Sequence, residues 1–529
     1  MPPSLGSEAL PLFPRIVSED GFMSMDSLLL QSGGHGRCQW LTTLFGVYLW
    51  AVHGAQVMSF VFIGKDVEGE FVGDSSLLRL TGTFFFIGWM CGLNLWGWLA
   101  ARRGWLVALA SMEALVVVGG LLTAMCTDAR PYLLCRVLVG FAEGGVPTCA
   151  YGYSSEFLLP ADKTRCITAL QLGFIGGSML LALAASASVS AAGTATAVHT
   201  GSLTAHTASA MFSWRELTIG ASLFALPVLL IARSMPESPR WLMRSGRVEE
   251  CARVLRSISE MNGHGTLDIT ANELLAASGK VSGHRGTAAA SAASSASGSI
   301  AGLLCAGGPV TRVTLTVALH AFAYTSAFFG LSVAIANDSA SGPHDDLITL
   351  ALQVPSVFVT GWMLERLGRR LALLVMLGAL GASCWGVAAF APAAGAPLHR
   401  SLAMVGCVIS SSMFSAGYVA SAEMFPTEVR SVGLSAMSQA ARLGGAMAPL
   451  ILLLADTNAS LPFAVWGGIA VVASLAALLL PETNGKASLE TLQDLSTLVE
   501  LPSPTRTLGS TWRASFRELD KGRPPKAGL

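Results

Sequence analysis

The chain has 529 residues, of which 52% are hydrophobic and only 12% are charged, with 33 basic and 33 acidic side chains. A soluble globular protein carries about 25% charged residues, so this composition argues against a soluble domain and favours a membrane protein with many spans. The zero net charge argues against a nucleic-acid partner. The ten cysteines form no CxxC pair and there is no histidine cluster, so we expect no metal site, no cofactor and no disulfide framework.

Twelve segments meet the requirement of about 20 mostly apolar residues for a spanning helix. They are 40-63, 77-100, 105-126, 131-153, 166-188, 214-234, 312-336, 346-364, 371-392, 401-421, 432-455 and 461-480. Six of these segments precede a long polar interval and six follow it. We therefore predict an all-α polytopic membrane protein, with twelve transmembrane helices in two pseudo-symmetric six-helix bundles.

This pattern predicts five regions along the chain. They are an N-terminal tail (1-38), an N-terminal bundle (39-234), a middle loop (235-310), a C-terminal bundle (311-480) and a C-terminal tail (481-529). In the middle loop, "RVEECARVLRSISEM" has the periodicity of an amphipathic helix, and 286-299 is of low complexity. We also expect the small-residue stretch that contains "SASVSAAGTATAV" to be a flexible outer loop between the fifth and sixth spans.

Basic residues in the short loops predict how the chain lies in the membrane. Arg102 and Arg103 follow the second span, Lys163 and Arg165 follow the fourth, and a further arginine group follows the eighth. These loops share one side with both tails and the middle loop, so we expect that side to be cytoplasmic. No signal peptide is visible before the first span, so we expect that span to insert uncleaved. We expect a plasma membrane or an endomembrane vesicle as the location.

Six motifs lie at the span junctions. In chain order they are "RVLVGFAEGGVP", "SSEFLLPADKTR", "PESPRWLMRSGR", "GWMLERLGRR", "AEMFPTEVRSVG" and "PETNG". This ordered set resembles the major facilitator superfamily, and within it the synaptic-vesicle-protein-related and organic cation/anion transporter branches. The resemblance implies alternating access around a cavity between the two bundles, near the membrane midplane.

In the family that the chain resembles, charged residues of these junctions act as gates. The matching residues here are Glu156, Arg165, Glu365, Arg366, Arg369, Glu423 and Arg430. We expect salt bridges from Glu156 to Arg165 and from Glu423 to Arg430, and the alternative role of the arginines is anchoring at the cytoplasmic face. The first-half copy "GWLAARRGW" departs from the family pattern, because Ala101 replaces an acid and Trp105 replaces a basic residue.

The resemblance also implies which spans line the cavity. The candidate substrate-binding residues on these spans are His53, Gln56, Glu143, Gln171, His320, Tyr324, Phe328, Gln353 and Arg442. Four of them, His53, Gln56, Gln171 and Gln353, stand where relatives carry acids. They keep hydrogen-bonding capacity without a fixed negative charge, so such a cavity favours organic cations less. Tyr324 and Phe328 follow His320 at helical spacing and suggest an aromatic wall, for which plain packing is the alternative.

Arg442 carries the one formal charge in "SQAARLGGAMAPL" and lies about ten residues into its span, or ~15 Å at 1.5 Å per residue. That depth is about half of a ~30 Å hydrocarbon core, where an arginine is costly. We therefore expect Arg442 to face the cavity, with either Glu143 or the substrate as its partner. Glu143 and Glu113 are also candidate proton sites, because an unpaired buried glutamate tends to be protonated, and a structural role is the alternative for each.

These features predict a secondary active transporter of small organic solutes, with an organic anion or zwitterion as the substrate and protons as a candidate coupling ion. No nucleophile with a base and no metal constellation is visible, so we do not expect an enzyme. The expected partners are the solute and the lipid bilayer, and we expect a monomer. Two alternatives are a sugar porter-like carrier and a non-transporting vesicle or receptor protein that retains the fold. The lack of a paired glutamine in the seventh span counts against the first alternative.

Overall fold

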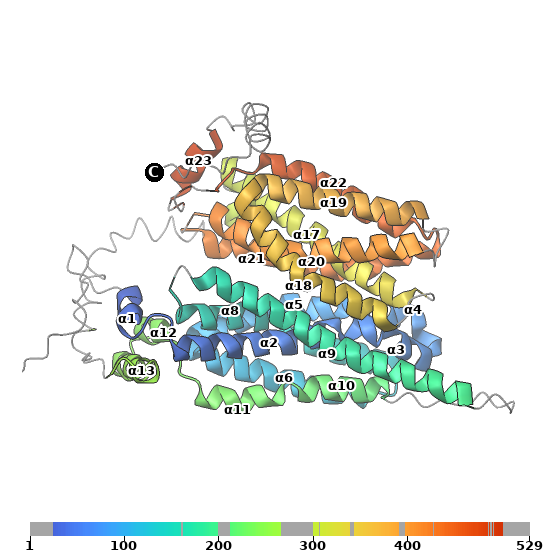
Figure 1. The fold of residues 1–529 in the computed structure, drawn as a ribbon, viewed down its shortest axis with the longest axis horizontal. Helices are drawn as coiled ribbons and strands as arrows, with labels where there is room; N and C mark the ends of the chain where they lie inside the picture. Colours follow the sequence, from blue (N-terminus) through green and yellow to red (C-terminus); the bar gives the residue numbers. More distant parts are fainter. Residues whose placement is uncertain are drawn as a thin grey trace, which may run out of the picture.

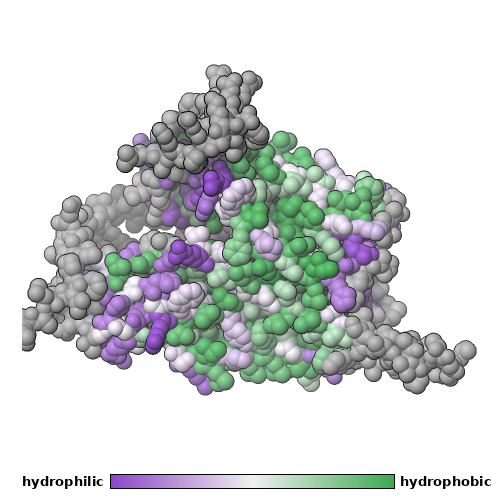
Figure 2. Space-filling view, viewed as in Figure 1, coloured by the Kyte–Doolittle hydropathy of each residue, from purple (hydrophilic) through white to green (hydrophobic). Residues whose placement is uncertain are grey.

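The computed structural model describes residues 25–159, 162–198, 212–265, 274, 300–305, 307–338, 343–390, 397–426, 428–484, 486, 489 and 491–500. These residues form helices and connecting turns, with no strand among them. Twelve helices or broken helices of the described part are long and apolar enough to cross a membrane, which confirms the predicted number. Apolar residues form a broad band across the middle of the molecule, with hydrophilic residues gathered toward its ends (Figure 2).

The N-terminal bundle contains six spans. They are α2 (Arg37–Phe62), α5 (Thr81–Arg103), α6 (Trp105–Ala124), α7 (Ala129–Glu143) with α8 (Val146–Glu156), α9 (Lys163–Val198), and α10 (Trp214–Leu223) with α11 (Leu226–Ser234). Two of the spans break where a proline follows, at Pro147 and Pro227, because proline lacks the N–H that continues the helical hydrogen bonds. Helices α2 and α9 approach closely, since a Cβ on Gly177 would lie 1.8 Å from the carbonyl oxygen of Ala51.

Helix α9 is longer than its predicted span and continues to Val198. The expectation of a flexible loop was therefore wrong for "SASVSAAGTATAV", where alanines favour helix. Residues 199–211 of the same stretch lie outside the described residues.

The C-terminal bundle also contains six spans. They are α17 (Gly308–Asn337), α18 (Pro343–Leu367), α19 (Arg369–Phe390), α20 (Pro397–Met424), α21 (Arg430–Leu452) continued by η4 (Leu453–Asp456), and α22 (Leu461–Ala476) continued by η5 (Ala477–Leu479). The two bundles lie side by side, with α9 next to α18 (Figure 1) and α5 packed on α21.

Short helices mark the two ends of the bundles. Helices α1 (Met25–Gln31), α12 (Pro239–Arg244) and α13 (Val248–Met261) lie at one end, called the α13 end below (Figure 1). Helices α3 (Gly64–Glu70) and α4 (Ser75–Leu78), joined by η1 (Val72–Asp74), lie at the opposite end, called the α4 end. Helices α16 (Ile300–Cys305) and α23 (Leu492–Glu500) pack on α17.

Helix α13 is the amphipathic helix predicted in the middle loop, and its buried residues include Cys251, Leu255 and Ile258. It is fastened to the N-terminal bundle by Asn262, whose Oδ1 accepts a hydrogen bond from the Cys38 N–H at 3.0 Å. The low-complexity stretch 286-299 lies outside the described residues.

The apolar core of the C-terminal bundle continues into the N-terminal bundle across the contact between α5 and α17, which is called the seam below. The buried residues of this cluster include Phe60, Phe86 and Trp89 of the N-terminal bundle together with Phe329 of α17. Tight packing at the seam therefore lies toward the α4 end, and the space between the bundles lies toward the α13 end.

Candidate functional site

A cavity of ≈ 410 Å³ lies between the two bundles. Its wall includes His53 and Gln171 from the N-terminal bundle and Tyr324 and Arg442 from the C-terminal bundle. It reaches the exposed residues Ser431 and Ser435 in the first turns of α21, so it opens toward the α13 end. Among the described residues that line it there is no aspartate or glutamate.

The opposite end of the cavity is closed by contacts between the bundles. Phe86 of α5 meets Phe329 of α17 with ring centroids 4.8 Å apart. The Thr83 hydroxyl donates to the carbonyl oxygen of Ala446 at 2.7 Å, and at the surface Arg79 Nη1 lies 2.8 Å from Asp456 Oδ1. The structure is therefore a conformation that is closed at the α4 end and open at the α13 end.

Trp89 of α5 forms the centre of the site. Its indole N–H donates to the carbonyl oxygen of Gly144 at 3.1 Å, at the break between α7 and α8. Its ring stacks on Phe86 with centroids 5.3 Å apart and an interplanar angle of 8°. The sequence reasoning missed Trp89, and the available signal was a tryptophan in the middle of a span, whereas tryptophans of membrane proteins gather at the interfaces.

Arg442 of α21 is buried, and its guanidinium carbon lies 4.8 Å from the centroid of the Trp89 ring, which is a cation–π contact. Its Nη1 donates to the Ser438 carbonyl oxygen at 2.5 Å and also to the Ser438 hydroxyl. Its Nε has no hydrogen-bond partner, and no carboxylate of the described residues lies within ion-pair distance of it. Arg442 thus brings a positive charge to the cavity wall that no acid in the described part neutralises.

Glu143, which was one of the two expected partners of Arg442, contacts His53 instead. The His53 Nδ1 and the Glu143 Oε2 are 2.5 Å apart, and both side chains are buried. The His53 ring meets the edge of Trp89 with centroids 4.8 Å apart. His53 therefore lines the cavity, and Glu143 lies outside its lining.

The other candidate residues are divided between the cavity and the surrounding packing. Gln171 and Tyr324 line the cavity, whereas Gln56, His320, Phe328 and Gln353 do not. His320 Nε2 donates to the Ala473 carbonyl oxygen at 2.9 Å, and Gln353 Oε1 accepts from the Ser411 hydroxyl at 2.8 Å. On the aromatic wall it is Phe329 that faces the cavity, while Phe328 packs on Phe414 with centroids 5.5 Å apart.

The junction residues of the C-terminal bundle form one network at the α13 end. Arg369 donates to both carboxylate oxygens of Glu423 at 2.8 Å each, and the Thr483 hydroxyl donates to the same carboxylate at 3.0 Å. Glu482 of "PETNG" accepts from the main-chain N–H groups of Arg369 at 2.9 Å and Arg370 at 3.1 Å. The start of α19 is thereby capped and held to the end of α20.

The N-terminal bundle forms the equivalent network with different residues. Glu156 pairs with Arg244 Nη2 at 2.5 Å and accepts from the Ser238 hydroxyl at 2.5 Å. Glu237 of "PESPR" accepts from the main-chain N–H groups of Trp105 and Leu106, both at 3.3 Å. Burial raises the pKa of Glu237. Trp105 occupies the position that corresponds to Arg369 in the C-terminal bundle, so it cannot form an ion pair with Glu156. The arginine that pairs with Glu156 is Arg244 of α12 instead.

The two expected salt bridges differ from those in the structure. Arg165 Nη1 lies 3.3 Å from Asp162 Oδ1, and Glu156 takes Arg244 as its partner. Arg430 donates to the carbonyl oxygen of Phe425 at 3.1 Å, while Glu423 takes Arg369. The remaining junction residues Glu365 and Arg366 are exposed.

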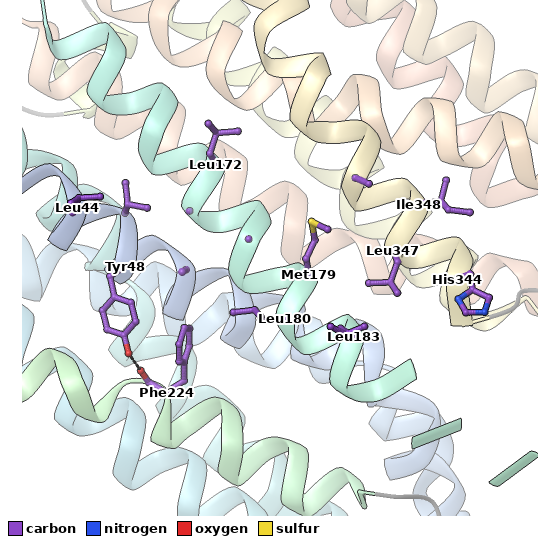
Figure 3. A pocket seen from close by; sticks show the side chains of 15 residues that line it. Leu44, Tyr48, Leu172, Met179, Leu180, Leu183, Phe224, His344, Leu347 and Ile348 are labelled. Atoms are coloured by element: carbon purple, nitrogen blue, oxygen red, sulfur yellow. Dashed lines mark hydrogen bonds between the residues drawn. The ribbon is translucent and has the colours of Figure 1, made fainter. Parts of the chain in front are cut away.

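A second, larger pocket of ≈ 1020 Å³ lies away from the central cavity, between α2, α9 and α18 (Figure 3). Its wall is almost entirely apolar and includes the exposed side chains Leu44, Leu180, Leu183 and Ile348. Exposed apolar side chains at mid-span face lipid in a membrane protein. This groove therefore belongs to the lipid-facing surface, and the smaller central cavity is the candidate substrate site.

Two six-helix bundles around a central cavity that is open at one end are the architecture of a membrane transporter, and the family match places the chain in the major facilitator superfamily. The family described as "Sugar (and other) transporter" matches residues 35–495, and the chain belongs to this family.

Relatives and a solved structure agree with this assignment. The chain is 27% identical to human solute carrier family 22 member 13 over 415 residues, which cover 78% of this chain and 68% of the relative. It is 28% identical to the organic cation transporter protein of Drosophila melanogaster over 441 residues, which cover 83% of this chain and 75% of the relative. The fold matches the inward-open xylose transporter XylE from E. coli with a TM-score of 0.65 at 18% identity, over 87% of this chain and 99% of that one. The chain is therefore a transporter of this family, and not an enzyme.

Proposed function

We propose that this transporter carries a small organic anion or zwitterion by alternating access, with Arg442 as the cation that binds the substrate's acidic group. The observation that carries the proposal is the charge of the cavity wall. The wall includes the buried Arg442 without a carboxylate partner in the described part of the chain, and its described residues contain no acid. An arginine presents fixed, paired N–H donors that match a carboxylate or sulfonate.

The aromatic residues around Arg442 support a substrate with a flat apolar body. Trp89, Phe329 and Tyr324 surround the guanidinium side of the cavity. A ring packed on these side chains would bury apolar surface, while its acidic group meets Arg442. One relative is named as a carrier of organic cations, so a cation is the competing substrate class, and the positive charge of Arg442 disfavours it.

The test is uptake into proteoliposomes of four probes, three of which share a benzene ring and differ in charge. They are benzenesulfonate as the anion, L-phenylalanine as the zwitterion, benzyltrimethylammonium as the cation and xylose as a neutral sugar. We expect uptake of the anion or the zwitterion above the other two. The Arg442→Ala variant is expected to lower that uptake by about 10- to 150-fold, which corresponds to the ~1.5–3 kcal/mol of a hydrogen bond to a charged group.

The matched control is Arg256→Ala, an exposed arginine on α13, which is expected to leave uptake unchanged. Preferred uptake of benzyltrimethylammonium or of xylose, or anion uptake that is unchanged in Arg442→Ala, would overturn the assignment. If none of the four probes accumulates, the assignment as a carrier of aromatic anions or zwitterions is wrong.

We further propose that the α13 end faces the cytoplasm, together with both chain termini. The support is the arginine content of that end, which includes Arg102, Arg244 and Arg369. We also propose that the protein acts as a monomer, because one chain encloses the whole cavity. Protease protection of terminal tags in sealed vesicles tests the first statement, and the mass of the purified protein in detergent tests the second.

A further inference from the structure

Three buried titratable side chains lie together inside the N-terminal bundle, next to the cavity. They are His53 on α2, Glu113 on α6 and Glu143 on α7, with exposures of 3%, 0% and 0%. Glu113 lies close enough to Glu143 for the two carboxyl groups to interact electrostatically. Both carboxyl oxygens of Glu113 and the Oε1 of Glu143 have no hydrogen-bond partner among the described residues. Substrate binding at Arg442 does not account for these groups.

One basic side chain contacts this cluster directly, and it is His53. On α2, the Tyr48 hydroxyl donates to the Phe224 carbonyl oxygen at 2.6 Å (Figure 3). On α7, Arg136 Nη2 donates to the Ser59 hydroxyl at 2.8 Å and its Nε to the Tyr132 hydroxyl at 3.3 Å.

The titratable groups on the remaining neighbours are also engaged elsewhere. On α8, the Tyr153 hydroxyl donates to the Pro236 carbonyl oxygen at 2.8 Å, the Tyr151 ring packs on Tyr418 of α20, and the Cys149 thiol is buried. Arg442 of α21 contacts Trp89 on the cavity wall, and Tyr324 of α17 lines that wall.

The two carboxyl groups are buried, and His53 separates them from the water in the cavity. The two groups are therefore not both ionised at the same time. Burial disfavours the charged form of a carboxyl group, and a second carboxylate nearby disfavours it further. The Glu143 carboxylate has His53 at 2.5 Å as its partner, whereas Glu113 has none in the described part. Of the two carboxyl groups, Glu113 is therefore the better suited to carry a proton in this conformation.

We infer that Glu113, Glu143 and His53 form a proton-binding site that couples proton movement to transport. The inference rests on the proposed function, because the coupled solute is the anion or zwitterion bound at Arg442. A side-chain rotation that brings the Glu113 carboxyl group to the free Oε1 of Glu143 passes the proton to Glu143. The proton then moves to the His53 imidazole and leaves the imidazole for water in the cavity that His53 lines. In the conformation that is open at the α4 end, the same groups take up a proton by the reverse steps.

Trp89 connects this site to the substrate. Its ring contacts His53 on one side, with centroids 4.8 Å apart, and the Arg442 guanidinium carbon lies 4.8 Å from its centroid. Loss of the proton leaves one additional negative charge in the cluster, and this charge weakens the binding of an anion at Arg442. Protonation and anion binding therefore favour each other, and the coupling is symport of a proton with the anion.

The first test uses benzenesulfonate, which stays anionic at all working pH values, so that a pH effect belongs to the protein. Wild-type proteoliposomes are expected to accumulate it when the medium is more acidic than the lumen, and to lose this accumulation with a protonophore. The Glu113→Gln variant is expected to lose acid-driven accumulation while it retains counterflow exchange of labelled for unlabelled benzenesulfonate. The Glu113→Asp variant, which restores a carboxyl group, is expected to recover part of the accumulation.

The matched control is Glu249→Gln on the exposed face of α13, which is expected to keep both activities. The second test needs no substrate and measures the infrared C=O stretch of protonated carboxyl groups in reconstituted protein at neutral pH. We expect a carboxylic-acid band in the wild type and in Glu249→Gln, and the loss of that band in Glu113→Gln.

The outcomes separate the proton site from the proposed function. Wild-type protein that shows counterflow but no acid-driven accumulation, or acid-driven accumulation that survives in Glu113→Gln, overturns the proton site and leaves the anion carrier standing. If benzenesulfonate is not transported at all, the infrared band alone tests the proton site. An unchanged band in Glu113→Gln then overturns the proton site as well.

Discussion

A single added methyl group at Gly445 is predicted to shift the transporter away from the conformation seen here. Gly445 lies on α21 at the closed seam, and a Cβ there would lie 2.6 Å from Cζ and 2.7 Å from Cε1 of Phe86 in the other bundle. The Phe86 ring cannot withdraw freely, because it is 1% exposed and packs between Trp89 and Phe329. Overpacking of this kind costs about 1–3 kcal/mol.

The cost of this methyl group falls mainly on one of the two conformations. Phe86 and Gly445 belong to different bundles, so alternating access separates them when the α4 end opens. The Gly445→Ala substitution is therefore expected to lower the ratio of protein open at the α13 end to protein open at the α4 end by about 5- to 150-fold, which is the population change that corresponds to about 1–3 kcal/mol.

Thiol accessibility measures this shift directly. Ser435→Cys places a reporter at the open mouth of the cavity, and Thr83→Cys places one at the closed seam, both in a background with the exposed Cys91 and Cys305 replaced by serine. In Gly445→Ala, modification of the first reporter by a charged methanethiosulfonate reagent is expected to slow, and modification of the second to quicken.

The matched control is Gly468→Ala on α22, where an added Cβ has no heavy atom within 4 Å outside its own helix segment. It is expected to leave both rates unchanged. Equal rates in Gly445→Ala and wild type at both reporters would refute the reasoning, because the seam would then tolerate the methyl group without opening.

Two further predictions concern stability in detergent. Gly177→Ala is expected to lower the apparent melting temperature, because its Cβ would lie 1.8 Å from the Ala51 carbonyl oxygen. The control is Gly176→Ala, which has open space around it and is expected to leave the melting temperature unchanged. At the α4 end, the hydrogen bond from Arg215 holds the pKa of Glu70 below its ordinary value of 4.5. A carboxyl group with a lowered pKa stabilises the fold at pH values above its unfolded pKa, and this contribution is lost as the pH falls through the folded pKa. The melting temperature of Glu70→Gln should therefore be below that of wild type at neutral pH and approach it in acid, and a difference that does not depend on pH would contradict the assignment.

Much of the fold could be predicted from the sequence because hydropathy and junction motifs are local properties of the chain. The twelve spans and the amphipathic helix α13 required only windows of neighbouring residues. The depth of Arg442 in its span followed from counting residues along one helix. The helical extension of α9 to Val198 was missed, because a run of small residues is compatible with both a loop and a helix.

The contacts within the site were less predictable from the sequence, because each one joins segments that are far apart in the chain. The partner of Glu143 is His53, 90 residues away, and that of Glu156 is Arg244, 88 residues away. Helical spacing suggested Phe328 for the aromatic wall, and only packing against α5 decided that the next residue, Phe329, faces the cavity instead.

The sequence by itself thus determined that this protein crosses the membrane twelve times and which charges its spans contain. The tertiary structure decided which of those charges meet. Insertion of a span depends on the summed transfer energy of its own side chains, which can be read from the sequence. The pairing of buried charges depends on how the helices pack, so only the folded bundles place Glu143 against His53 and leave Arg442 on the cavity wall beside Trp89.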